Sequence, residues 1–176
     1  MTSSFSSSTK WDKGVDYETA YTMLLRKINS VKNSKIKCYL MVALVQLRNG
    51  SRISEAIRAF KEWIKTSKTE LYVRVSKKKK PELRLMVIPS ELEQHRLLCV
   101  DLVEVEDKKL RNRVLATLHR LFKLNTHSLR YAFITYLLKN NVNVAIVSKM
   151  IKHSRLDTLL HYVQVKESER VLREMM

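Results

Sequence analysis

Apolar residues recur at helical spacing along most of this chain. Between Asp16 and Asn33 they stand three and four residues apart, and the spacing returns in "RISEAIRAFKEWIK" after Ser51. The stretch "KIKCYLMVALVQLR" is strongly apolar and stops at Asn49-Gly50, a signal that ends helices. The predicted helices cover about 16–33, 34–49, 51–65, 90–103, 107–123, 126–139, 143–152 and 167–176.

Polar residues that cap helices stand at the starts of several of these segments. The expected N-caps are Asp16, Ser34, Thr126 and Asn143. Ser90 and Glu93 have the spacing of a capping box, in which each side chain bonds the backbone of the other residue. These residues mark where the predicted helices begin.

The spacing of apolar residues changes once, from the helical period to the alternation typical of β-strands. "ELYVRVS" (70–76) is β-branched and alternating, "KKKKPE" (77–82) is a turn, and "LRLMVIP" (83–89) is a second extended run. We expect a mainly α fold with one small β-hairpin, and the two glycines and two prolines agree with few breaks. The polar start of the chain, 1–14, is expected to be a disordered tail, and 15–176 a single domain.

The cysteines and the termini suggest an intracellular protein. Cys38 and Cys99 fall in apolar helical patterns without a CxxC spacing, so two reduced core thiols are expected. The longest apolar run, Cys38 to Leu47, is about half of the roughly 20 residues that a membrane span needs. The N-terminus lacks the apolar region of a signal peptide. A cytoplasmic location follows as the expectation.

The charge points to an anionic partner. The chain has 34 Lys and Arg against 17 Asp and Glu, a formal net charge of +17. Nucleic acid is the first candidate partner, and an anionic membrane surface is the second. The membrane is disfavoured because the basic residues are spread over many elements rather than along one amphipathic helix.

Three polar groupings are candidates for chemistry. Arg52 stands at the start of a helix, where free N–H groups and the helix dipole favour a phosphate, although alone it is more simply a solvated arginine. His127 and Arg130 are three residues apart and share a helix face, which is either an exposed amphipathic face or a proton-transfer and phosphate-clamping pair. Tyr162 follows His153 by nine residues. A tyrosine there is usually packed, but among cations its phenolate could attack a phosphodiester.

Motifs for other chemistries are missing from the sequence. There is no HxxxH or paired Cys/His spacing for a metal, no GxxxxGK[ST] for nucleotide phosphates and no GxSxG. Phosphoryl transfer without a metal requires side chains that neutralise the charge of the transition state. Arginines, histidines and a lysine-rich hairpin are suited to that task.

The order of these groupings resembles the catalytic domain of the tyrosine recombinases, the phage-integrase family. "NGSRISEA" (49–56, the first box) is similar to G-x-R-x-S-E, with Arg52 as its arginine and Glu55 as its acidic neighbour. "HSLRYAF" (127–133, the second box) is similar to H-x-x-R and supplies His127 and Arg130. The resemblance covers about 15–176 and implies the tyrosine-recombinase catalytic-domain fold.

The third box completes the resemblance. "KHSRLDTLLHY" (152–162) is similar to the segment in which a histidine precedes the nucleophilic tyrosine by nine residues, which gives His153 and Tyr162. In this family a catalytic lysine lies on the hairpin. Strand alignment favours Lys78, and Lys77 and Lys79 are alternatives. The whole pattern looks most like integrases of archaeal viruses or plasmids, which would act in the host cytoplasm at the nucleoid.

The resemblance implies a site-specific recombinase that cleaves and rejoins DNA strands through a 3′-phosphotyrosyl intermediate. Tyr162 would attack the phosphate, Arg52 and Arg130 would hold its oxygens, and His127 would accept or shuttle a proton. His153 would hydrogen-bond a phosphate oxygen, and the hairpin lysine would protonate the leaving oxygen. No metal or other cofactor would be needed. The remaining hairpin lysines, Lys77, Lys79 and Lys80, are expected to contact DNA.

The partners implied are double-stranded attachment-site DNA and further copies of the chain. A monomer is expected in the free state and a homo-tetramer on DNA. Two departures from the family are expected: Lys152 replaces the usual glycine before the third-box histidine, and the chain has no room for the N-terminal DNA-grasping domain that the resemblance implies. A type IB topoisomerase-like enzyme uses similar groups, and an inactive basic DNA-binding module is the alternative from another class.

Overall fold

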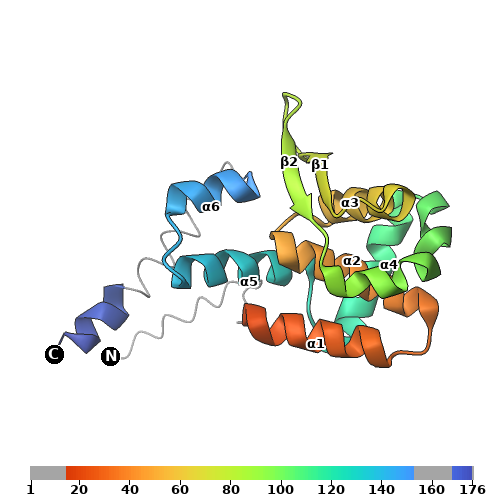
Figure 1. Cartoon of the computed structure of the whole chain (residues 1–176). Coiled ribbons are helices and arrows are strands. Elements are labelled where there is room, and N and C mark those ends of the chain that lie inside the picture. The colour runs from red at the N-terminus through yellow and green to blue at the C-terminus, as the bar shows by residue number, and fades with distance from the viewer. Residues whose placement is uncertain (1–14, 153–167, 176) are drawn as a thin grey trace, which may run out of the picture.

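The computed structural model describes residues 15–152 and 168–175 (Figure 1). Its elements are α1 (Tyr17–Ser30), α2 (Ser34–Asn49), α3 (Ile53–Thr66), β1 (Glu70–Arg74), β2 (Leu83–Val87), the 3₁₀ helix η1 (Ser90–Glu104), α4 (Asp107–Phe122), α5 (Thr126–Lys139) and α6 (Val144–Ile151). Residues 168–174 are also helical, within the predicted terminal helix. The expectation of a mainly α chain with one small hairpin is confirmed for the described residues.

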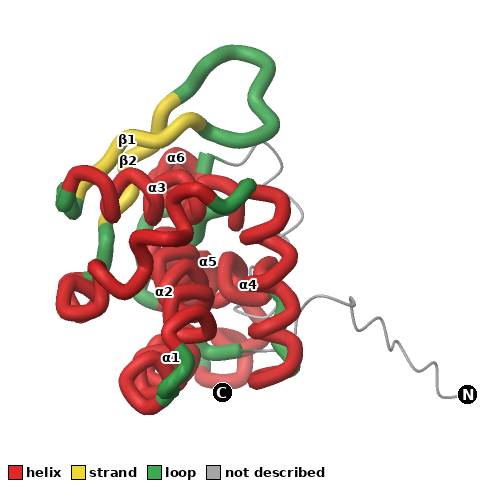
Figure 2. Tube along the Cα trace, turned by 90° about the vertical axis from the view of Figure 1, so that its right-hand side faces the viewer, coloured by secondary structure: helices red, strands yellow, loops and turns green. Residues whose placement is uncertain are grey.

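Helix α2 forms the centre of the fold. It packs against α1, α3, α4, α5, η1 and β2, and every residue from Cys38 to Leu47 is buried (Figure 2). A helix that is apolar on all sides is stable in water only when protein surrounds it. This burial explains the longest apolar run of the sequence. No helix in the described ranges is long and apolar enough to cross a membrane.

The hairpin extends beyond the helical body (Figure 2). Strands β1 and β2 are antiparallel, with Tyr72 opposite Leu85 and Val73 opposite Arg84. Alternate residues face the helices, so Leu71, Val73 and Met86 are buried while Tyr72 and Leu85 stay exposed. The lysine-rich turn therefore projects from a hairpin whose base is anchored in the core.

Two of the predicted N-caps are confirmed. The Asp16 carboxylate accepts a hydrogen bond from the backbone N–H of Thr19 at 3.0 Å. The Asn143 side chain accepts one from Ala145 N–H at 2.8 Å. Each bond satisfies a donor that the helix itself leaves unpaired.

The other two N-caps were predicted one residue too late. Asn33 rather than Ser34 caps α2, and Asn125 rather than Thr126 caps α5. In each case the asparagine amide oxygen accepts a hydrogen bond from the backbone N–H three residues on, at 3.1 and 2.8 Å. Asparagine competes well with serine and threonine for this role, so the earlier residue takes it.

The predicted capping box at Ser90 is wrong. Element η1 begins at Ser90 without a side-chain cap. The Glu93 carboxylate instead accepts hydrogen bonds from Trp63 Nε1 at 3.2 Å and Arg96 Nε at 3.1 Å. In the tighter 3₁₀ helix residues three apart share one face, so Arg96 lies beside Glu93, and Cys99, on the same face, is buried.

The prediction of two reduced thiols is also wrong. Cys38 of α2 and Cys99 of η1 form a disulfide, with their Cα atoms 5.7 Å apart. Packing of η1 on α2 brings the two cysteines within the range that a disulfide spans, although they are 61 residues apart in sequence. In the chain-entropy model, closing a loop of this length stabilises the fold by about 4 kcal/mol.

Gly50 makes the turn from α2 into the first box. It ends α2 in the left-handed region, with φ of 54°. A Cβ added at this position would lie 2.1 Å from Cδ1 of Phe133, a buried ring of α5. Both the backbone conformation and the close approach of α5 therefore require glycine here.

We predict that Gly50→Ala destabilises the protein by about 2–4 kcal/mol, the sum of left-handed strain and a displaced ring. Urea unfolding would measure the change. Ser67 also has a left-handed backbone, with φ of 62°, but is exposed, so Ser67→Gly serves as the control and should not lower stability. Equal midpoints for Gly50→Ala and the unaltered protein would contradict the steric argument.

Candidate functional site

The first box is organised by a buried carboxylate. Glu55, in the first turn of α3, has a side chain that is 0% exposed. It accepts hydrogen bonds from the backbone N–H of Arg52 at 3.1 Å and from Arg52 Nη1 at 3.2 Å. Arg52 is the N-cap residue of α3 and its side chain is 22% exposed. Arg52 is therefore partly buried and held in one orientation by Glu55. Its sequence position alone had favoured a solvated arginine.

Sequence reasoning missed a third arginine, Arg84 of β2. It is only 4% exposed, and it donates to Glu55 Oε2 at 3.2 Å and to the Asn49 carbonyl at 2.6 Å. Burial lowers the pKa of the Arg84 guanidinium, and the charge of Glu55 opposes that change. A signal was present in the strand: the alternation that buries Met86 puts Arg84 on the same inward face.

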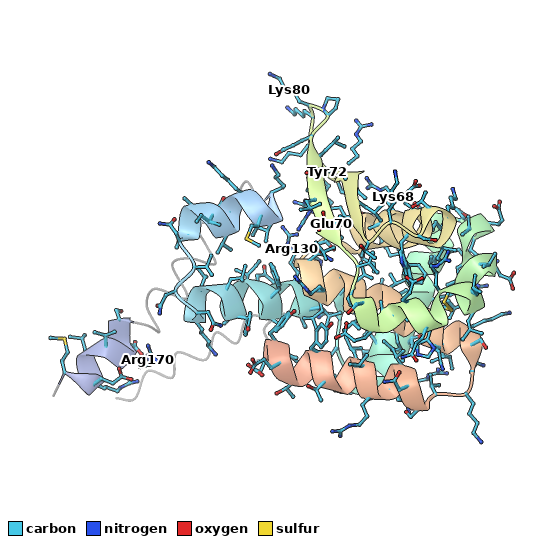
Figure 3. The ribbon with its side chains drawn as sticks, viewed as in Figure 1. Lys68, Glu70, Tyr72, Lys80, Arg130 and Arg170 are labelled. Carbon is cyan, nitrogen blue, oxygen red and sulfur yellow. A yellow bond between two sulfur atoms is a disulfide. The ribbon has the colours of Figure 1, made fainter. Side chains whose placement is uncertain are left out.

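Arg130 of the second box joins distant parts of the chain. Its Nη1 donates to the Gly50 carbonyl at 2.8 Å, and its Nη2 donates to the Ile151 carbonyl at 3.1 Å. The side chain is 6% exposed, and Figure 3 shows it on α5 below the hairpin. Both bonds go to neutral main-chain groups. The guanidinium is thus fixed in place without losing its charge to a carboxylate.

The arginines act on one another electrostatically. Burial lowers the pKa of Arg130 to about 10, and the charges of Arg52 and Arg84 act in the same direction, while Glu55 opposes them. Arg52, Arg84 and Arg130 therefore form a cluster around a single buried carboxylate, which we call the arginine cluster. A cluster of this kind is suited to hold an anion such as a phosphate.

His127 lies beside this cluster. It is exposed in the first turn of α5. Partial desolvation lowers the pKa of its imidazole, and the charges of Arg130, Lys77 and Arg52 lower it further. The predicted partners of the first and second boxes are thus brought together, with a hairpin lysine near them. A lowered pKa keeps the imidazole neutral at neutral pH, so it can accept a proton.

The hairpin lysines differ in their surroundings. Lys77 has a left-handed backbone, with φ of 62°, and its charge acts on His127. Lys78 lies 3.6 Å from the Glu82 carboxylate, as an ion pair. Lys79 and Lys80 are exposed, and Figure 3 shows Lys80 at the far end of the hairpin. Lys77 is the hairpin lysine whose charge lowers the pKa of His127.

Only the first residue of the third box is described. Lys152 ends α6 in the left-handed conformation, with φ of 51° and ψ of 44°. The turn is therefore made without a glycine, as the sequence required, and Lys152 Nζ lies 2.9 Å from the Glu82 carboxylate. The predicted catalytic residues His153 and Tyr162 lie outside the described residues.

The described site suits an anion better than a metal. In the described ranges no group of three or more His, Cys, Asp or Glu residues could hold a metal ion. The polar groups at the site are instead the arginine cluster, His127 and the hairpin lysines. These donors match the oxygens of a phosphate.

The chain is similar to three other proteins, two viral and one archaeal. It is 37% identical to "Putative integrase ORF241" of Acidianus two-tailed virus, over 94% of this chain and 68% of that protein. It is 33% identical to "Putative integrase V10" of Sputnik virophage, over 92% of this chain and 88% of that protein. It is 29% identical to an uncharacterized protein of Methanocaldococcus jannaschii, over 93% of this chain and 87% of that protein.

No family model and no solved structure matches the chain. The two viral relatives are each more than 30% identical to it, and the alignments span more than two thirds of each relative. The chain therefore belongs to the family of these viral integrase-named proteins.

Proposed function

We propose that this chain is a site-specific DNA recombinase of the tyrosine recombinase class that cleaves and rejoins strands through a 3′-phosphotyrosyl link. The observation that carries the proposal is the position of Arg130. Its two hydrogen bonds join the second box to Gly50 of the first box and to Ile151, two residues before His153. The first and second boxes and the residue just before the third box are thus joined by contacts that no motif demanded. The names of the viral relatives agree with integration.

The proposed reaction is a transesterification at one phosphodiester of double-stranded DNA. The phenolic oxygen of Tyr162 attacks phosphorus, and the bond from phosphorus to the 5′ oxygen breaks. Arg52 and Arg130 hold the non-bridging oxygens, whose negative charge grows in the transition state. The phenolic proton passes to His127, whose lowered pKa supports this role. His153 hydrogen-bonds the phosphate, and a hairpin lysine protonates the leaving 5′ oxygen.

The free energy of the cleaved bond is kept in the phosphotyrosyl link. The released 5′ hydroxyl, or that of another strand, can attack the link and reform DNA. We propose that this exchange needs neither metal nor nucleotide, because side chains neutralise the phosphate. In a virus-encoded protein of this kind the reaction would take place in the host cytoplasm.

Assembly on DNA is part of the proposal. The helical residues 168–174 and Met175 carry exposed apolar side chains at Val171, Leu172 and Met175. The net charge of +17 opposes association of the free protein, and DNA would neutralise it. We propose a monomer in solution and a homo-tetramer on paired DNA sites, with this C-terminal segment in the contact between protomers.

The decisive experiment uses a nicked duplex that traps the covalent intermediate. The unaltered protein should form a protein–DNA adduct in EDTA. Tyr162→Phe should bind the duplex with equal affinity and form no adduct, because the ring is kept and the nucleophile is lost. An adduct with this variant would move the nucleophile to another residue, such as Tyr131 or Tyr136. No adduct with the unaltered protein would leave a DNA-binding module without this chemistry.

Arg130→Lys should lower the cleavage rate on the order of 10²-fold or more, the scale of losing one preorganised donor to an oxyanion. A lysine cannot bond two carbonyls and clamp a phosphate with one planar group. Single-turnover cleavage and duplex affinity would be measured together, with Arg120→Lys on the exposed face of α4 as the control. Equal losses of affinity and rate would make Arg130 a binding residue only.

The identity of the proton-donating lysine is open to a direct test. Lys78 is expected from strand alignment, whereas its pairing with Glu82 and the charge of Lys77 on His127 favour Lys77. We predict that Lys77→Ala slows cleavage more than Lys78→Ala. A substrate with sulfur in place of the 5′ oxygen should restore the rate of the affected variant, because a thiolate leaves without a proton. Rescue of Lys78→Ala alone would reverse the assignment.

A further inference from the structure

Glu82 forms ion pairs with both the hairpin turn and the end of α6. Its carboxylate lies 2.9 Å from Lys152 Nζ at the end of α6 and 3.6 Å from Lys78 Nζ in the hairpin turn. Lys152 directly precedes His153, and Lys78 is one of the four turn lysines. A single acidic side chain thus bridges the lysine turn and the start of the third box.

The backbone fixes the place of this bridge. Beyond the paired strands, the N–H of Val75 donates to the carbonyl of Glu82 at 2.8 Å, which adds a further rung to the hairpin. The loop from Ser76 to Pro81 therefore begins and ends at a defined pair of residues. Ser76 is held in turn, because its N–H donates to buried Glu55 at 3.0 Å. The lysines between these points depend on side-chain contacts such as the Glu82 bridge for their remaining order.

We propose that Glu82 is a positioning residue, which fastens the lysine turn to the end of α6 so that the hairpin lysine and the third box reach one phosphate together. The inference rests on the proposed strand cleavage. It also explains why an acidic residue stands in a turn that is otherwise suited to bind DNA. The hydrogen bond of Lys152 and the charges of both lysines lower the pKa of the Glu82 carboxyl, so the ion pairs add to the ionisation that a glutamate already has at neutral pH.

The bridge contributes to geometry more than to stability. The side chains of Glu82, Lys78 and Lys152 are between 28% and 36% exposed, and ion pairs in such surroundings add little to the free energy of unfolding. Catalytic rates are far more sensitive to position, since a displacement of about 1 Å costs up to 100-fold. Loss of Glu82 should therefore leave the fold intact and affect the chemical step.

Binding and cleavage should respond in opposite directions. Glu82→Gln removes a negative charge beside the DNA backbone and frees two lysines, so duplex affinity should be equal or a few-fold tighter. Cleavage by the bound protein should nevertheless be about tenfold slower, because the turn is no longer held. A group that only repels DNA would give tighter binding with equal or faster cleavage. A group that only supports the fold would lower the melting temperature and the affinity.

Glu70→Gln provides the matched control. Glu70 lies on β1 of the same hairpin, is exposed, and forms no ion pair with a described residue (Figure 3). The Glu70→Gln substitution changes the net charge by the same amount as Glu82→Gln and should not slow cleavage. Lys152→Gln should slow cleavage as Glu82→Gln does, and the double variant should be no slower than the slower single variant, because both remove one bridge. Additive losses, or unslowed cleavage by Glu82→Gln, would overturn the proposal.

A second measurement does not require activity. Amide hydrogen exchange of the DNA-free protein should become faster in 76–82 on Glu82→Gln and stay unchanged on Glu70→Gln. Unchanged exchange in 76–82 would overturn the bridge. If the unaltered protein forms no adduct with the nicked duplex, the proposed cleavage fails, and the exchange result still decides whether Glu82 holds the turn.

Discussion

The buried carboxylate of Glu55 is the interaction on which this site depends. A charge removed from water is tolerated only when several donors surround it. Glu55 accepts bonds from the backbone and side chain of Arg52, from the backbone of Ser76 and from Arg84. These donors come from the start of α3, the residues after β1, and β2. One carboxylate thereby fixes the first box and the base of the hairpin relative to each other.

The balance of charge around Glu55 determines what the site can bind. Arg84 is buried, and its ion pair with Glu55 balances its charge. Arg52 is partly exposed. The two hydrogen bonds of Arg130 described above both go to main-chain carbonyls, which do not neutralise its charge. The site therefore keeps positive charge toward the side where His127 and Lys77 lie. Preorganised charge of this kind needs no rearrangement when a phosphate arrives.

Local patterns in the sequence were sufficient to predict most of the helices and the hairpin, whereas the first two boxes were assigned by family resemblance and their contact came from the structure. Gly50 marked the end of α2, and the change of period marked the hairpin. The pairing of Cys38 with Cys99 and the role of Arg84 depend on packing between elements far apart in sequence. No local spacing encodes such contacts. In the third box the structure tests the prediction only at the turn of Lys152, since His153 and Tyr162 lie outside the described residues.

The disulfide gives the chain a topology that its linear order does not have. With Cys38 joined to Cys99, the segment between them becomes a covalent ring that contains the first box, the hairpin and Glu82. The second and third boxes follow the ring as a tail. During synthesis from the N-terminus, every residue of the ring is added before His127, so the ring and the two later boxes are successive parts of the chain. A cut in the lysine turn would open the ring and still leave a single connected molecule.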